Sequence, residues 1–513
     1  MKELELVIPP EEINNQEYIA NIAAKFLNIN RNLVKQVDVY KRSIDARSLK
    51  VIYRIKVKVY LEQVPAPEIF TVNYPNVRDK KPVLIIGAGP AGLFAALRCI
   101  ELGLKPIILE RGKDVKQRRR DLALINKEGI INPESNYCFG EGGAGTYSDG
   151  KLYTRSNKRG DIQKVLNILV AHGATQDILI DARPHIGTNK LPQIIVAIRE
   201  TILNAGGEVN FNTKVTDFII ESNTIKGVKT SQGNFNSDSL VLATGHSARD
   251  IYHLLHAQGI LLEAKPFALG VRIEHPQIIV DQAQYHCDTR SAYLPPSYYS
   301  LVEQVDNRGV FSFCMCPGGI IAPCATSPDE IVVNGWSPSR RNNPFANSGT
   351  VVQINLEDVA GDQNDPLRLL NFQSQIESRA FKAGGGNLVA PAQRMVDFVE
   401  SKFSSNLPTN SYLPGCKSTN LKEVLPEFIF ERLKKALPVF GSKMKGYYTN
   451  EALLVGVESR TSSPVRIPRD KFTLQHPQVK GLFPCAEGAG YAGGIISAAI
   501  DGVNCIDAAF KIL

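Results

Sequence analysis

Residues 83–92 read VLIIGAGPAG, and this stretch decides the fold. Its apolar start predicts a buried strand, and its glycines predict a tight turn that opens a helix. We expect Gly87 to permit the turn, Gly89 to let the backbone approach a pyrophosphate, and Gly92 to let the helix pack on the strand. The pattern is typical of a dinucleotide-binding unit, and the residues of the turn predicted to contact the cofactor are Gly87, Ala88, Gly89, Pro90, Ala91 and Gly92.

A second apolar run, residues 106–109, ends on Glu110 and completes a strand-helix-strand unit. Glu110 lies about 20 residues after the turn, where an acid accepts a hydrogen bond from a ribose hydroxyl. The phosphates would lie at the helix N-terminus, where free N–H groups favour anions. The basic run at residues 118–120 is either a solvated helix face or a source of cofactor contacts, and we predict that Arg111 and Arg118 reach the cofactor.

Size and composition are those of a multidomain globular protein. A chain of 513 residues is too long for one compact core, so two or three domains are expected. The hydrophobic content of 43% and charged content of 21% are typical of soluble proteins. The net charge of +8 is mild and no basic stretch is interleaved with aromatic residues, which makes nucleic-acid binding an unfavoured hypothesis. The nine scattered cysteines favour reduced thiols over a disulfide framework.

The chain start and the longest uncharged stretch bear on location. Acids occur within the first five residues, and no sustained apolar segment of a signal peptide follows. Residues 82–97 are uncharged, but they contain the glycine turn and are shorter than the roughly 20 residues that span a bilayer. We therefore predict a cytoplasmic protein without a membrane span.

Four segments are predicted. Residues 1–78 form a small α+β domain, and residues 79–264 form the first part of the dinucleotide-binding domain. Residues 265–445 change character, with strand-like runs, proline-rich turns and few helices apart from about 366–382, and we interpret them as an inserted substrate domain. Residues 446–513 return to the cofactor domain. The fold class is therefore α/β, a Rossmann-like domain with an inserted β-rich domain and an N-terminal α+β domain.

Two further glycine-rich stretches match the pattern GxGxxG. Residues 140–145 follow no clear strand, so they are either a surface turn or a loop whose N–H groups wrap a phosphate or the flavin edge. We predict cofactor contacts at Gly142, Gly143 and Ala144. Residues 488–493 follow a strand, but too little chain remains to complete a second nucleotide unit. We expect this turn to aim a second helix N-terminus at the first cofactor, through Gly494 and Ile495.

The motifs together resemble the glutathione-reductase-like flavoproteins with two dinucleotide-binding domains. Residues 240–245 read LVLATG, and the resemblance places Ala243, Thr244 and Gly245 beneath the nucleotide. It also implies contacts from Val215 to adenine and from Glu487 to the ribitol or pyrophosphate; Glu487 replaces the usual Asp, which lengthens the side chain. The cofactor that the resemblance implies is FAD.

A closer resemblance is to the uncharacterised bacterial FAD-dependent dehydrogenase family. Its matching segments run almost end to end, at residues 41–47, 139–151, 314–319, 460–466 and 487–494. A more distant similarity is to geranylgeranyl-reductase-like flavoproteins. The resemblance implies a cofactor and a reaction class, and it leaves the substrate open.

Candidate chemistry near the flavin is predicted at few side chains, because the flavin itself carries the electrons. Cys314 and Cys316, with Cys324 nearby, are either a redox pair facing the flavin or ordinary reduced cysteines that point to one face of a strand. The latter interpretation is favoured. No metal site is predicted, since the three cysteines lack a suitably spaced fourth ligand.

Four other side chains each have a structural and a functional interpretation, and none is assigned as catalytic. Arg460 and Arg466 flank a short loop, as its ionic anchors or as a clamp for an anionic substrate or flavin phosphate. His185 is a proton donor or a structural residue, and Tyr491 lines the substrate face or packs.

The predicted function is FAD-dependent oxidoreduction, with hydride transfer between an unidentified organic substrate and the flavin. No complete second nucleotide unit is visible, so any NAD(P)H would dock transiently. The alternative is a flavoprotein that binds or acts on a macromolecule such as RNA, with a partly structural FAD.

Overall fold

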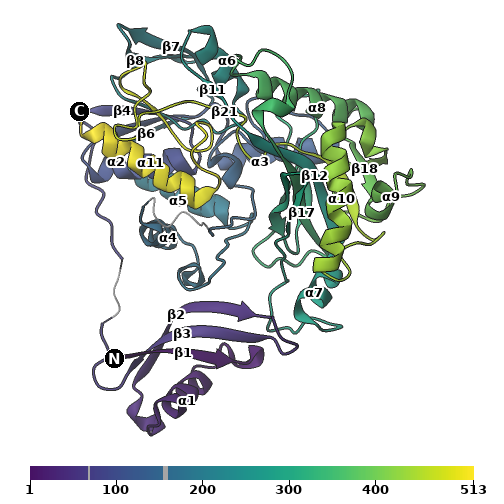
Figure 1. Cartoon of the computed structure of the whole chain (residues 1–513). Coiled ribbons are helices and arrows are strands. Elements are labelled where there is room, and N and C mark those ends of the chain that lie inside the picture. Colours follow the sequence, from purple (N-terminus) through teal and green to yellow (C-terminus); the bar gives the residue numbers. More distant parts are fainter. Residues whose placement is uncertain (67–69, 154–159) are drawn as a thin grey trace.

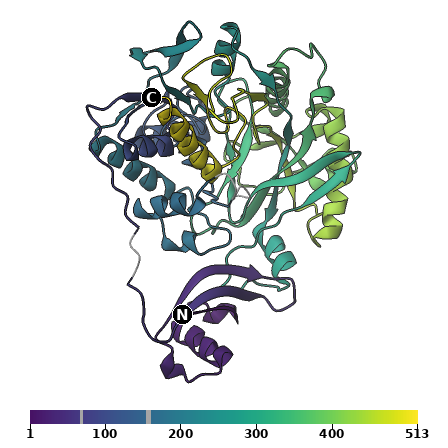
Figure 2. The same ribbon diagram turned by 60° about the vertical axis from the view of Figure 1, so that its left-hand side comes forward.

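The computed structural model describes residues 1–66, 70–153 and 160–513 (Figure 1). A parallel sheet with helices and a large mixed sheet lie side by side, and a small N-terminal sheet lies below them in the two views (Figures 1 and 2). Among the described residues, no helix is long and apolar enough to cross a membrane.

The parallel sheet carries the glycine turn. Its order is β22-β10-β4-β5-β6, with bounds Leu482–Pro484, Leu240–Leu242, Pro82–Ile86, Lys105–Leu109 and Glu208–Asn210. Alternate residues of β4 enter different cores: Val83 and Ile85 face one side, and Leu84 and Ile86 face the other. Burial on both faces explains why this strand is apolar throughout. The structure confirms the Rossmann-like α/β class.

Helices and a small sheet cover the two faces of the parallel sheet. The first core is shared by α2 (Pro90–Glu101), α4 (Ile162–Ala171), α5 (Leu191–Asn204) and α11 (Ile495–Phe510). The second is covered by α6 (Arg249–Ala257) and by the antiparallel sheet β7-β8-β9, at Val215–Glu221, Thr224–Thr230 and Gly233–Asn236. Helix α3 (Val115–Glu128) follows β5. Strands β4, β10 and β22 run parallel to one another, so their carboxyl ends lie at one edge of the sheet, beside the glycine turn.

The mixed sheet forms the β-rich part. Its order is β13-β14-β17-β12-β20-β18-β19, at Val302–Val305, Arg308–Cys316, Phe345–Ile354, Phe267–Pro276, Leu453–Glu458, Ala390–Arg394 and Cys416–Ser418. Two short pairs accompany it: β15 (Ile320–Pro323) with β16 (Val333–Trp336), and β11 (Glu263–Ala264) with β21 (Val465–Arg466). Its helices are α7 (Gln277–Tyr285), α8 (Arg368–Gly384), α9 (Met395–Val399) and α10 (Glu427–Lys443).

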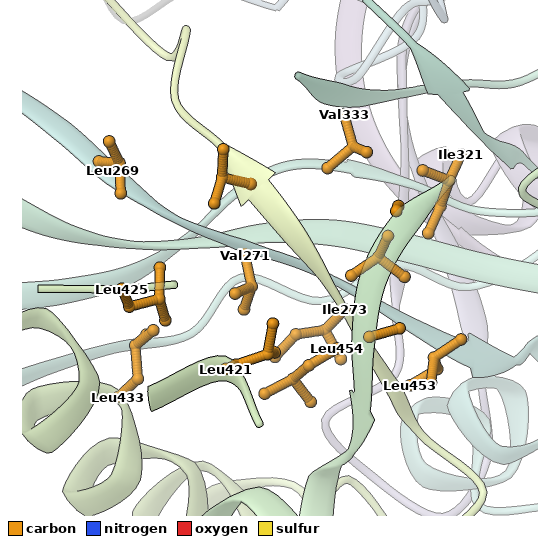
Figure 3. Close-up of a cluster of buried hydrophobic side chains, with 14 of the residues drawn as sticks. Leu269, Val271, Ile273, Ile321, Val333, Leu421, Leu425, Leu433, Leu453 and Leu454 are labelled. Carbon is orange, nitrogen blue, oxygen red and sulfur yellow. The ribbon is translucent and has the colours of Figure 1, made fainter. Parts of the chain in front are cut away.

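Helix α10 corrects the expectation of few helices here. It runs for 17 residues despite Pro438 in its interior. Its buried face packs through residues such as Leu433 on a core that also holds Val271 and Ile273 of β12 and Leu454 of β20 (Figure 3). Tertiary burial thus outweighs the local signal of the proline.

Strand β20 also bears on the predicted boundary at residue 446. It pairs antiparallel with β12 and with β18, and so belongs to the mixed sheet. The next strand, β21, pairs with β11 close to the parallel-sheet cores. We therefore propose that the return to the cofactor domain begins after β20, later than the sequence suggested.

The N-terminal part is an antiparallel sheet, β1-β3-β2, with one helix. The bounds are Lys2–Ile8, Ile52–Tyr60, Gln36–Asp45 and, for α1, Gln16–Leu27. Its core also includes Tyr285 and Leu294 from the mixed-sheet part. Arg42 of β2 pairs with Asp181 at 2.7 Å and Asp177 at 3.1 Å. The small sheet thus contacts both of the larger parts.

Candidate functional site

A cavity of about 950 Å³ lies where the carboxyl ends of β4, β10 and β22 meet the mixed sheet. Ligands of open parallel sheets bind at this edge. One wall comes from the glycine turns and helix N-termini, and the opposite wall comes from β14 and β16. The predicted cofactor residues that line it are Gly87, Gly89, Pro90, Ala91, Glu110, Arg111, Gly143, Ala144, Val215, Ala243, Thr244, Gly245, Glu487, Gly494 and Ile495.

The first glycine turn is built as its sequence predicts. Gly87 has φ +102°, and a Cβ there would lie 2.5 Å from the carbonyl oxygen of Ala243. A Cβ at Gly92 would collide with the carbonyl oxygen of Gly87. Only glycine satisfies both restraints, because it tolerates a left-handed backbone and close backbone approach. Helix α2 therefore starts close to the sheet, with its N-terminus in the cavity wall.

The last glycine turn brings a second helix N-terminus to the same cavity. Gly494 caps α11, and Gly494 and Ile495 line the wall beside Gly89 and Pro90. A Cβ at Gly502 would collide with the carbonyl oxygen of Ala91, so the close packing of α11 on α2 requires glycine. Two positive helix ends facing one space suit an anion such as a pyrophosphate.

Asp501 of α11 anchors the turn that precedes it. The Ala486 N–H donates to its Oδ2 at 2.7 Å, and Arg469 forms two hydrogen bonds to its carboxylate at 2.9 and 2.7 Å. Cys485 and Cys505 lie close to this carboxylate. The Arg469 guanidinium occupies the position of a counter-ion, so this buried group is an anchor for the turn.

Glu110 lines the cavity but is engaged by the backbone. Its Oε2 accepts from the Ala88 N–H at 2.9 Å, and its Oε1 accepts from the N–H groups of Gly112 and Gly140, each at 2.9 Å. The carboxylate thus ties the first glycine turn to the loop at residues 140–145. A carboxylate has further acceptor capacity, so this arrangement is compatible with a ribose contact.

Three of the residues predicted to contact the cofactor, Ala88, Gly92 and Gly142, do not line the cavity. They lie directly behind its wall. The Gly142 N–H donates to the carbonyl oxygen of Ala88 at 2.8 Å. This bond joins the second glycine loop to the first. A Cβ at Gly143 would lie 3.1 Å from the Cα of Gly89, so the two loops approach within contact distance.

Arg118 lies outside the cavity wall, contrary to the expectation of a cofactor contact. It is fully buried, and its guanidinium donates to the carbonyl oxygens of Asn136, Tyr137 and Glu141 at 2.8–2.9 Å. Every nitrogen of the guanidinium is used. Arg118 therefore positions the loop at residues 136–145, and the basic run was a misleading signal for ligand contact.

Arg111 lies at one end of the cavity. It stacks 4.4 Å from the ring centre of Phe139 and pairs with Glu134 at 2.6 Å and Asp250 at 2.8 Å. Val215, the first residue of β7, lines the same end. Near the middle, Glu487 lies 3.5 Å from Nδ1 of His246.

The far end of the cavity lies against β14 and β16 and carries several charged and polar side chains. Lys151 Nζ lies 3.5 Å from the sulfur of Cys314 and 3.5 Å from that of Cys316. Asp149 lies 3.7 Å from the same nitrogen and pairs with Arg341 at 2.8 Å. Burial opposes the charge on Asp149, but Lys151 and Arg341 outweigh it and hold its pKa at about 2.

Arg183 and Tyr298 form an aromatic-cation pair at this far end. The guanidinium lies 3.9 Å from the ring centre of Tyr298 and 5.8 Å from that of Tyr153. All three side chains line the cavity, as does Trp336 of β16. Within the described parts of the chain, no carboxylate pairs with Arg183.

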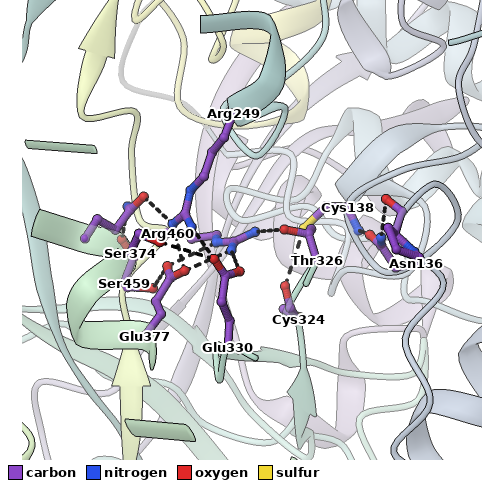
Figure 4. A network of polar contacts seen from close by, with 12 residues as sticks. Asn136, Cys138, Arg249, Cys324, Thr326, Glu330, Ser374, Glu377, Ser459 and Arg460 are labelled. Atoms are coloured by element: carbon purple, nitrogen blue, oxygen red, sulfur yellow. Dashed lines mark hydrogen bonds and ion pairs between the residues drawn. The ribbon is translucent and has the colours of Figure 1, made fainter. Parts of the chain in front are cut away.

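Arg460 and Arg466, for which the sequence left two interpretations open, lie in different surroundings in the structure. Arg460 lines the cavity but is held by a buried network with Arg249, Glu330 and Glu377 (Figure 4). Arg466 pairs with Glu263 at 3.5 Å outside the cavity wall.

His185 and Tyr491 likewise differ. His185 also lies outside the wall, with Nε2 3.2 Å from the carbonyl oxygen of Ser339. Tyr491 lines the cavity wall, and the backbone N–H of Arg469 donates to its hydroxyl oxygen at 3.1 Å. The position of His185 outside the cavity wall favours a structural role over that of a proton donor.

Sequence reasoning did not single out Arg183, Tyr298, Trp336 or Arg341. They stand on segments far apart in the chain and share no spacing, so no local motif marks them. Lys151 ends the glycine-rich segment 139–151, and its closeness in sequence to the glycine loop was the available signal.

Comparison with known proteins agrees with this geometry. Residues 82–118 match an FAD-binding domain model, residues 266–461 match the C-terminal domain-like model of FAD-dependent proteins, and residues 1–60 match a domain of unknown function. An uncharacterised protein from Clostridium beijerinckii is 40% identical over 500 residues, which are 94% of this chain and 93% of the relative.

The chain belongs to the uncharacterised FAD-dependent dehydrogenase family. It is a FAD-dependent oxidoreductase, and the matches name no substrate. The glycine cradle and the two helix N-termini fit FAD. The matches give no support to the RNA alternative.

Solved structures similar to this chain include a glycine oxidase and an L-proline dehydrogenase. Glycine oxidase from Bacillus cereus is 13% identical, with 85% of this chain and 96% of that chain covered and a TM-score of 0.31. L-proline dehydrogenase from P. horikoshii is 11% identical, with 84% and 93% covered and a TM-score of 0.31. Likeness at this level carries no argument about the substrate of this family member.

Proposed function

We propose that this flavoprotein transfers a hydride between a small organic anion and FAD at the far end of the cavity. The FAD would extend from Arg111 and Val215, past the two helix N-termini, to the wall formed by β14 and β16. When bound, it supplies the two-electron chemistry. The chain's own residues then have to bind and orient the substrate.

The observation that carries the substrate class is the charge at the far end. Three cationic side chains, Lys151, Arg183 and Arg341, face one carboxylate, Asp149. An excess of positive charge in a partly enclosed space favours an anion, since few waters screen the attraction. Arg183 is suited to anchor a carboxylate because its planar guanidinium donates two parallel hydrogen bonds.

The aromatic side chains define the rest of the substrate. Tyr298 holds the Arg183 guanidinium against its ring, and Trp336 lines the same space. Apolar and aromatic walls of this kind bind the hydrocarbon part of a ligand and exclude water. The favoured substrate is therefore an organic acid with an apolar or aromatic portion.

The test is an anaerobic screen that follows bleaching of the flavin absorbance. We expect aromatic or branched organic acids to bleach the flavin, and their amides or methyl esters to do so at least tenfold less efficiently. Arg183→Ala should raise the KM for the acid at least tenfold, while FAD content stays unchanged. Arg466→Ala is the matched control, since Arg466 lies outside the cavity wall and should leave KM unchanged.

Two outcomes would overturn the proposal. One is equal bleaching by acids and their neutral analogues, and the other is an unaffected KM in Arg183→Ala. The same assay with NAD(P)H tests whether a nicotinamide docks transiently on the flavin. Rapid bleaching by NAD(P)H alone would identify it as the electron donor.

A further inference from the structure

Cys314 and Cys316 do not lie on a regular strand. The pairing of β14 with β17 shifts between Phe313 and Cys316, and Cys314 has φ +47°. A left-handed backbone is uncommon for a residue other than glycine, and such residues cluster at functional sites. The irregularity overturns the idea of two cysteines in simple strand alternation.

The irregularity places both sulfurs beside one lysine. Residues two apart in a regular strand are separated by about 6.6 Å, near the upper limit for the Cα atoms of a disulfide. In the structure, both sulfurs lie 3.5 Å from Lys151 Nζ, and the Cys316 thiol donates to the carbonyl oxygen of Cys314 at 3.3 Å.

Two cations surround the pair. Lys151 approaches both sulfurs from the cavity side at 3.5 Å. Arg272 lies behind them, with Nη2 2.8 Å from the Cys314 carbonyl oxygen and 3.5 Å from the Cys316 sulfur. The hydrogen bond from Cys316 and the two cations hold the pKa of Cys314 well below its usual range, although burial opposes this.

Other cysteines provide the contrast. Cys324 also lines the cavity, but burial raises its pKa well above the usual range. Burial likewise raises the pKa of Cys416 to about 12. An ordinary buried thiol is inert, whereas a thiolate beside a lysine is a nucleophile.

The two sulfurs differ in access. Cys314 lines the cavity with Lys151, whereas Cys316 is fully buried behind it. This arrangement has the form of an attacking and a resolving cysteine, one facing the cofactor space and one protected.

We propose that Cys314 and Cys316 form a reversible disulfide that exchanges two electrons with FAD. When the pair is oxidised, the S–H bond of Cys316 breaks and an S–S bond to the Cys314 thiolate forms, and two electrons and the Cys316 proton pass to the oxidised flavin. The reverse transfer restores the thiolate and the thiol. The pair gives the protein a second two-electron store beside the flavin.

The first test is reductive titration of the FAD-loaded protein, oxidised in air and then made anaerobic. FAD per chain is measured beforehand, so a failure to bind FAD is separated from a failure of this proposal. Wild type should accept four electrons per FAD from dithionite, because disulfide and flavin are both two-electron couples. Cys314→Ser and Cys316→Ser should each accept two.

Matched controls separate this pair from other thiols. Cys287→Ser removes a cysteine outside the cavity wall and should leave the capacity at four electrons. Cys324→Ser tests the neighbouring thiol in the wall and should also leave it at four. A fall to two electrons in Cys324→Ser would overturn the assignment of the pair.

The second test needs neither FAD nor folded serine variants. Peptide mapping after oxidation by diamide should recover Cys314 joined to Cys316. In the reduced wild type, iodoacetamide should label Cys314 at least tenfold faster than in Lys151→Met, because the lysine stabilises the thiolate. A titration that ends at two electrons in wild type, or unbridged cysteines after oxidation, would overturn the proposal.

Discussion

Glu377 offers the sharpest test of how the cavity wall is held. Its carboxylate is fully buried and accepts from Arg249 at 2.7 Å and from Arg460 at 3.0 Å, while Ser459 donates at 2.5 Å (Figure 4). The network joins α6, α8 and the segment that leaves β20. We expect the substitution Glu377→Gln to keep the shape of this group and remove its charge.

The loss of folding stability expected in Glu377→Gln follows from the ionisation of Glu377. Burial alone would raise its pKa, but Arg249 and Arg460 outweigh burial and lower the pKa from 4.5 to about 2. A shift of this size corresponds to roughly 3 kcal/mol of stability at neutral pH. Breaking a buried ion pair by removing one partner typically costs about 3–5 kcal/mol, which agrees.

The stabilisation by Glu377 should decrease as the pH falls. A carboxyl whose folded pKa is depressed contributes its full stability above the unfolded pKa and loses it as pH falls toward the folded pKa. The difference between wild type and Glu377→Gln should therefore be constant above about pH 5.5. It should shrink by roughly 1 kcal/mol by pH 3.5.

Urea unfolding of the full chain, followed by circular dichroism at several pH values, measures this difference. Glu400→Gln is the matched control, because Glu400 pairs with Lys402 at 2.6 Å on the surface and its loss should leave the midpoint unchanged. A loss below about 1 kcal/mol at pH 7, or a difference that does not change between pH 5.5 and 3.5, would refute the reasoning.

Two further predictions concern the cofactor and the N-terminal sheet. Gly502→Ala should raise the FAD dissociation constant at least tenfold, because the added Cβ meets the Ala91 carbonyl and separates α11 from α2; fluorescence of released FAD measures this, and unchanged affinity would contradict it. Arg42→Met should raise the KM for an acid substrate several-fold at constant FAD content, because Arg42 holds the segment that leads from Asp181 to Arg183; an unaltered KM would contradict this, and loss of FAD would point to a broader structural role.

Local sequence was sufficient for the cofactor cradle. Gly87 and Gly92 perform backbone roles that only a residue without Cβ allows, so their spacing is visible in the sequence. The strand before the turn is apolar at every position because both faces are buried, and this too is a local signal. The family resemblance added the place of Thr244 and Glu487 in the same wall.

Local sequence misled where tertiary contacts outweigh it. Arg118 belongs to a basic run, but its guanidinium is fully buried on three carbonyls. Helix α10 contains a proline, but one face is buried against the mixed sheet. Neither burial is encoded by neighbouring residues.

The sequence by itself determined that this chain binds a dinucleotide through a glycine turn between two strands, because that turn is a continuous segment whose backbone geometry demands particular residues. Only the tertiary structure decided what faces the flavin end of the cavity. Lys151 and Arg183 come from one part of the chain, Cys314 and Trp336 come from another, and the two parts meet at the cavity. Charge balance and sulfur reactivity depend on distances across that junction, and no spacing along the chain specifies them.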